Sequence, residues 1–89
     1  MAANDIPAAL AGESGVTIRS SAQLGALVKE VRRSQGLLQA DLAGLSGTGN
    51  RYVVDLERGK PTLQLQKVLD MLDLLGLEVR VVPKRASLS

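Results

Sequence analysis

The sequence of 89 residues contains no cysteine and no histidine, and a single tyrosine is its sole aromatic residue. Without cysteine, the chain has no internal disulfide framework and no thiolate zinc site. Without histidine, it lacks the commonest general base and the commonest metal ligand. One aromatic side chain is also too little for stacking on single-stranded bases. We therefore expect a protein that is not an enzyme and that uses no metal and no cofactor.

Long apolar runs and known phosphate or nucleophile motifs are missing as well. No apolar stretch approaches the ~20 residues of a membrane helix, and the opening MAANDIPAALAGESG does not have the basic start of a signal peptide. These features predict a cytoplasmic protein. There is no G-x-S-x-G elbow and no G-x-x-x-x-G-K-[ST] loop. A net charge of +2 permits nucleic-acid binding without requiring it.

What the sequence does contain is a series of short helical patterns, in a chain whose 45% apolar content suits one small domain. Helices are expected from Ser20 or Ser21 to Gly36, over about 39–46, from Asn50 to Gly59, and from a Thr62 cap to Gly76. The Ala- and Gly-rich residues 1–19 are predicted to be a flexible arm and 83–89 a flexible tail, which leaves 20–82 as the domain. The residues expected to face inward are Leu24, Leu27, Val28, Val31, Leu42, Ala43, Val53, Leu56, Leu65, Val68, Leu69 and Leu72, with Leu45 as a further candidate on the second helix.

The stretch LEVRVV, residues 77–82, alternates apolar and charged residues and predicts a short strand. No other strand is expected in the chain, and a lone strand is unstable. Pairing with its own copy across a twofold homodimer would resolve this; the alternative is a frayed end. The expected dimer residues are Leu63, Met71 and Leu74, a second apolar set on the fourth helix, together with Val79 and Val81 on the strand.

Two short helices joined by a glycine turn make a helix-turn-helix unit. The segment GLLQADLAGLSGTGNRYVVDLERGKPT resembles the core of phage-repressor-like (XRE-type) DNA-binding domains. From Ser21 to Val82 the chain further resembles HipB-type antitoxins. That resemblance implies an all-α bundle of four to five helices with a C-terminal strand that pairs across a homodimer. It also implies binding to a palindromic operator, repression of the protein's own operon, and a HipA-like Ser/Thr kinase toxin as partner.

The third helix is the expected reader of DNA bases. With Val53 and Leu56 turned inward, Asn50 and Arg51 would face the major groove, where Asn pairs with adenine and Arg with guanine. Asp55 lies four residues after Arg51 and would either orient it or accept a hydrogen bond from a cytosine amino group. The simpler alternative is an ordinary solvated helix surface.

The resemblance implies two further roles. Gln39 would contact the DNA backbone at the start of the second helix, and an Arg32–Glu57 pair would tie the first helix to the third. Weaker candidates for phosphate contacts are Thr48, Tyr52, Lys60 and Thr62. The sequence departs from the family pattern where Leu38 replaces the usual Ser or Thr cap and where Gly49 replaces a polar residue. The alternatives to an antitoxin are a free-standing regulator of the same fold and a protein-interaction adaptor.

Overall fold

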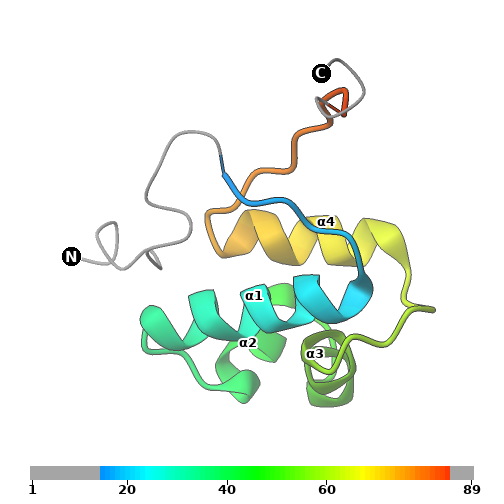
Figure 1. Ribbon diagram of the computed structural model, residues 1–89. Coiled ribbons are helices and arrows are strands. Elements are labelled where there is room, and N and C mark those ends of the chain that lie inside the picture. Colours follow the sequence, from blue (N-terminus) through cyan, green and yellow to red (C-terminus); the bar gives the residue numbers. More distant parts are fainter. Residues whose placement is uncertain (1–14, 85–89) are drawn as a thin grey trace.

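Four α-helices make up the regular structure of residues 15–84, the part of the chain that the computed structural model describes (Figure 1). They are α1 (Ser21–Ser34), α2 (Gln39–Ser46), α3 (Asn50–Glu57) and α4 (Leu65–Leu74). The all-α helix-turn-helix prediction is confirmed. Most of the predicted arm and tail, residues 1–14 and 85–89, lies outside the described residues.

The start of α1 follows from its cap. Ser20 has an extended backbone, and its hydroxyl accepts a hydrogen bond from the N–H of Gln23 at 3.1 Å. This bond satisfies one of the free N–H groups that every helix start leaves. Of the two serines that the sequence offered, Ser20 is therefore the cap.

One apolar core holds the four helices together. α3 packs against α1 and α2, and α2 packs against α4. The core residues, all buried, are Val28, Val31, Leu42, Ala43, Val53, Leu56, Val68, Met71, Leu72 and Leu75. Burying each Val, Leu or Met among them contributes about 1.5–3 kcal/mol, so this core is the main source of stability.

Helix α4 differs from the prediction in three ways. It begins at Leu65 after an N-cap at Gln64, so Thr62 is not its cap. Leu65, the first residue of the helix, is exposed and does not face inward, and the same holds for Leu45 on α2. Met71 was assigned to an outward-facing set but is completely buried, because it shares the inward stripe with Val68 and Leu72 at spacings of three and four.

After α4 the chain continues in an extended form without regular structure over residues 77–84. No strand is present between residues 15 and 84. A strand needs a hydrogen-bonded neighbour, and the predicted neighbour of this segment was a second copy of the chain. Within the same described residues, no helix is long and apolar enough to cross a membrane.

Candidate nucleic-acid interface

Helices α2 and α3 are joined by a three-residue turn, residues 47–49. Gly47 ends α2 with a left-handed backbone (φ 73°), a conformation that other residues adopt at a cost. The Ser46 and Thr48 hydroxyls are 2.9 Å apart and share a hydrogen bond inside the turn. The turn thus fixes the angle between the two helices, and Thr48 has a structural partner within it.

The first turn of α3 presents Asn50 and Arg51 to solvent. The Arg51 side chain is 87% exposed, and its Nε lies 3.2 Å from Oδ1 of Asp55. The other carboxylate oxygen of Asp55 lies 3.7 Å from Nζ of Lys60. Asp55 is therefore shared between two cations and is only 18% exposed, whereas the terminal nitrogens of Arg51 remain directed outward for another partner.

Below this surface lies a buried ion pair between α1 and α3. Nε of Arg32 donates to Oε2 of Glu57 at 2.5 Å, and Nη2 donates to Oε1 at 3.1 Å. Nη1 of Arg32 donates to the carbonyl of Leu37 at 2.6 Å, which ties in the loop before α2. No buried side-chain nitrogen or oxygen in residues 15–84 lacks a hydrogen-bond partner.

Gln39 is the first residue of α2 and joins the same network. Its Nε2 donates to Oε1 of Glu57 at 3.0 Å. The side chain is half-buried, so one amide N–H and the amide oxygen are left for a partner outside the protein. The sequence resemblance pointed to Gln39 and to Glu57 separately; the structure brings the two into direct contact.

Tyr52, the third residue of α3, links this helix to the residue before α4. Its hydroxyl donates to the carbonyl of Gln64 at 3.1 Å. Burial raises the pKa of this phenol above its ordinary value of 10.0, so the group stays protonated and keeps donating. Nζ of Lys67 lies 5.8 Å from the ring centre, within the range of a cation–π contact.

Lys67 is a candidate that sequence reasoning missed. It is exposed in the first turn of α4, outside the helix-turn-helix segment of residues 36–62. Its position beside Tyr52 depends on how α4 is placed in the fold, which no local sequence pattern marks. The exposed Thr62 and Lys60 lie in the preceding loop. The two lysines add positive charge beside α3, Lys60 near Asp55 and Lys67 near Tyr52.

The predicted dimer residues fall into different environments. Leu63 is half-buried and packs against the core, and Met71 is fully inside it. Leu74, Val79 and Val81 are exposed. No group of three or more potential metal ligands occurs within residues 15–84.

The comparisons with known proteins agree with this geometry. A family model described as a helix-turn-helix domain matches residues 23–84. A protein of Sinorhizobium fredii, named as an uncharacterized HTH-type transcriptional regulator, y4mF, is 49% identical over 65 residues, which cover 73% of this chain and 86% of that protein. The family match covers most of α1 and all of α2, the turn, α3 and α4. The chain belongs to the helix-turn-helix domain family.

Proposed function

We propose that this protein is a sequence-specific DNA-binding transcriptional repressor that acts as a homodimer on a palindromic operator. The observation that carries the proposal is the arrangement of Arg51, exposed in the first turn of α3 and held at Nε by Asp55. With Nε occupied, the two terminal nitrogens are free to donate to O6 and N7 of one guanine. Asn50 beside it is available for an adenine. In this proposal Asp55 orients Arg51 and does not read a cytosine.

Phosphate contacts would set the register of the protein on the duplex. Gln39 is suited to this role because the contact with Glu57 fixes its side chain and leaves one amide N–H outward at the start of α2. Lys60, beside Asp55, and Lys67, beside Tyr52, would add salt-dependent affinity along α3. The hydroxyls of Thr48, Tyr52 and Thr62 are further candidates; two of them already have partners within the protein.

The finer assignment, an antitoxin of a HipBA-like module that restrains a HipA-like kinase and represses their operon, is supported by the resemblance of residues 21–82 to HipB-type antitoxins. Its test is separate from that of DNA binding. In this test, the neighbouring gene is co-expressed with the gene for this protein in one host, and we expect a kinase-like protein to copurify. A chain that binds its operator but retains no such partner is a free-standing regulator.

The DNA-binding proposal is tested with the promoter of the protein's own gene. Binding of the wild type and of Arg51→Ala to that duplex and to scrambled duplexes is measured across a salt series. We expect the wild type to prefer the promoter and Arg51→Ala to lose about 1–3 kcal/mol of that preference per half-site, with a nearly unchanged salt dependence. Absence of binding to any duplex, or an unaltered preference in Arg51→Ala, would contradict the proposal.

A variant of Asp55 distinguishes its two possible roles. Asp55→Asn keeps the size of the side chain but removes the charge that holds Arg51 and Lys60. If Asp55 orients Arg51, we expect this variant to weaken preference for the guanine that Arg51→Ala also fails to read. A change confined to a different base pair, a cytosine, would instead assign Asp55 to direct base reading.

A further inference from the structure

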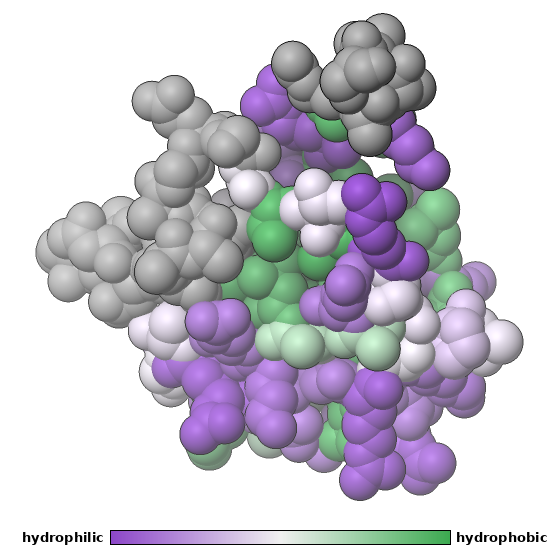
Figure 2. Space-filling view, viewed as in Figure 1, coloured by the Kyte–Doolittle hydropathy of each residue, from purple (hydrophilic) through white to green (hydrophobic). Residues whose placement is uncertain are grey.

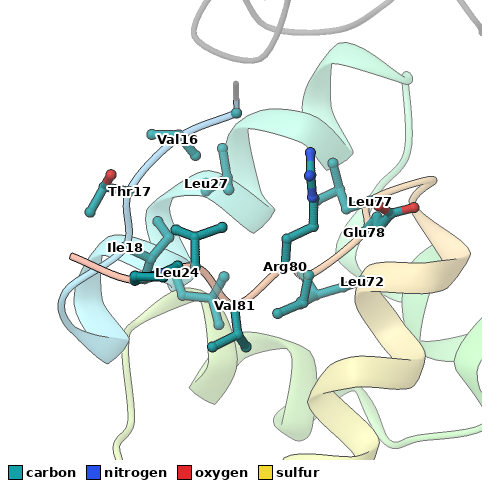
Figure 3. A pocket seen from close by; sticks show the side chains of 14 residues that line it. Val16, Thr17, Ile18, Leu24, Leu27, Leu72, Leu77, Glu78, Arg80 and Val81 are labelled. Carbon is teal, nitrogen blue, oxygen red and sulfur yellow. The ribbon is translucent and has the colours of Figure 1, made fainter. Parts of the chain in front are cut away.

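An open apolar groove lies between the two extended ends of the described chain, residues 15–19 and 77–83, where they run over α1 and α4 (Figure 3). Its volume is about 900 Å³. Apolar surface gathers at the centre of this face of the molecule, with hydrophilic side chains below it (Figure 2). The apolar lining includes Val16, Ile18, Leu24, Leu27, Leu72 and Leu77. Contiguous exposed apolar surface of this kind is characteristic of interaction sites.

The segment beside the groove has the properties of an unpaired sheet edge. Within residues 15–84, the backbone N–H and C=O groups of residues 78–82 have no hydrogen-bond partner. Arg80 and Val81 leave the segment on opposite sides (Figure 3). Val79 and Val81 are 55% and 96% exposed, an unfavourable position for β-branched apolar side chains in a single chain. Both the backbone and the side chains therefore lack a cover.

We propose that the cover is a second copy of this chain, whose residues 77–81 pair antiparallel with the same residues of the first copy about a twofold axis at Val79. In this register Val79 lies opposite the partner's Val79, and Leu77 lies opposite the partner's Val81. On the other face of the ribbon, Glu78 lies opposite the partner's Arg80, and Arg80 opposite the partner's Glu78. Residues directly opposite share a face, so apolar meets apolar and opposite charges meet twice.

Other twofold registers lose this match. An axis at Arg80 places two arginines opposite each other, and an axis at Glu78 does the same with two glutamates; like charges directly opposite are destabilising. An axis between two residues mixes the apolar and charged faces, because a slip of one residue turns every side chain over. An axis at Val81 pairs Glu78 with the partner's Lys84, but it places Arg80 opposite Val82 and Val79 opposite Pro83, which has no N–H for the ladder. Charge complementarity and the position of Pro83 together select the axis at Val79.

The pairing also explains the groove. Leu77, Val79 and Val81 of both copies would share one face of a two-stranded ribbon, and that face is apolar enough to close over Leu24 and Leu27. The inference rests on the homodimer of the proposed function and adds its register. In this dimer the contacts are made by Val79 and Val81, which are exposed in the single chain, and not by the buried Met71.

Single cysteines test the register, because the chain has none of its own. Val79→Cys would stand about 4.5–5.5 Å (Cα–Cα) from its copy, within disulfide range. Val81→Cys, on the same face, would be about 14 Å from its copy, well beyond that range. Each variant of the full chain is oxidised mildly and examined on a non-reducing gel, and its oligomeric state is measured under reducing conditions. We expect Val79→Cys to cross-link and Val81→Cys to stay uncross-linked.

Charge variants give a second, independent readout. Glu78→Arg and Arg80→Glu each place two like-charged pairs in the homodimer, and we expect the dissociation constant of each dimer to rise roughly tenfold. A mixture of the two variants restores both pairs and should form heterodimers in preference to either homodimer. The double variant Glu78→Arg/Arg80→Glu should return to the wild-type dissociation constant.

The outcomes separate this inference from the proposed function. Three results would contradict the register but not the homodimer. They are dimers that cross-link through position 81, dimers that cross-link through neither position, and charge variants that show no preference for the mixed pair. A chain that is monomeric at all concentrations would overturn the register and the homodimer together. The Arg51→Ala experiment measures DNA binding independently, so the DNA-binding proposal is tested separately from the dimer.

Discussion

Glu57 joins the buried core to the surface proposed to bind DNA. It accepts two hydrogen bonds from Arg32, inside the bundle, and one from Gln39, at the start of α2. The carboxylate is nearly inaccessible to solvent, so its charge is balanced only by the guanidinium beside it. A change at Glu57 should therefore affect folding first and DNA binding second.

We expect Glu57→Gln to destabilise the protein by about 3–5 kcal/mol, because it leaves the Arg32 guanidinium buried without a counter-charge. A domain of this size has about 5–15 kcal/mol in total, so the loss is a large share. Urea unfolding measures it. Asp73→Asn, an exposed acidic residue on α4, is the matched control and should stay within about 0.5 kcal/mol of the wild type. Equal unfolding midpoints for both variants would show that the ion pair contributes little.

Some of these side-chain contacts can be predicted from the sequence, and others cannot. Residues at fixed spacing on one helix, such as Arg51 and Asp55, can be paired from the sequence because the helix geometry determines their distance. The contacts of Gln39 with Glu57, and of Lys67 with Tyr52, join different helices. Their distances depend on how those helices pack, and no local pattern encodes that.

The elements differ in how strongly local sequence defines their ends. The start of α2 is defined poorly: Leu38 is its N-cap, with an extended backbone (φ −83°, ψ 163°) but no side-chain hydrogen bond. Half of a capping box is already present, because Oδ2 of Asp41 accepts from the Leu38 N–H at 2.8 Å. The Leu38 side chain is 68% exposed, so its removal costs little burial.

Leu38→Ser should complete this cap and stabilise the protein by about 1 kcal/mol, which raises the Tm of a domain this small by roughly 4–8 °C. The hydroxyl would accept one of the N–H groups that the leucine leaves open. Leu38→Ala removes the same side chain without adding an acceptor and is the control. Thermal unfolding followed by circular dichroism distinguishes the two. A serine variant no more stable than the alanine variant would mean that solvent already satisfies this helix start.

The four helices could be predicted because each has its own apolar spacing and a glycine or serine near its ends. The close approach of α1 to α3 could not. At Gly25 a Cβ atom would lie 2.3 Å from the carbonyl oxygen of Leu56, so only glycine lets the two helices meet there. From the sequence, Gly25 is merely a weak helix residue. The error at Thr62 has a related cause, since the loop before α4 is held by Tyr52 and Gln64 across the fold.

A homodimer would account for two features of the whole molecule that a single chain does not explain. One is the apolar groove with its unpaired edge at residues 78–82. The other is that a single recognition helix reads only a few base pairs, whereas a twofold pair reads two half-sites one turn of DNA apart, about 34 Å. If the ribbon about Val79 sets the distance between the two α3 helices, operator spacing becomes a property of the protein that can be measured.

We expect affinity for the operator to depend sharply on the spacing between its half-sites. Insertion of about five base pairs moves one half-site to the opposite face of the duplex, and insertion of about ten returns it to the same face but doubles the separation. A dimer held by the ribbon should bind neither, and affinity should fall towards the non-specific level, by roughly 10³-fold or more. The control is replacement of the central base pairs at unchanged length, which should be tolerated. If the five-base-pair insertion is bound as tightly as the natural operator, the two recognition helices are not held by a fixed dimer, because a rigid pair cannot follow a half-site around the duplex.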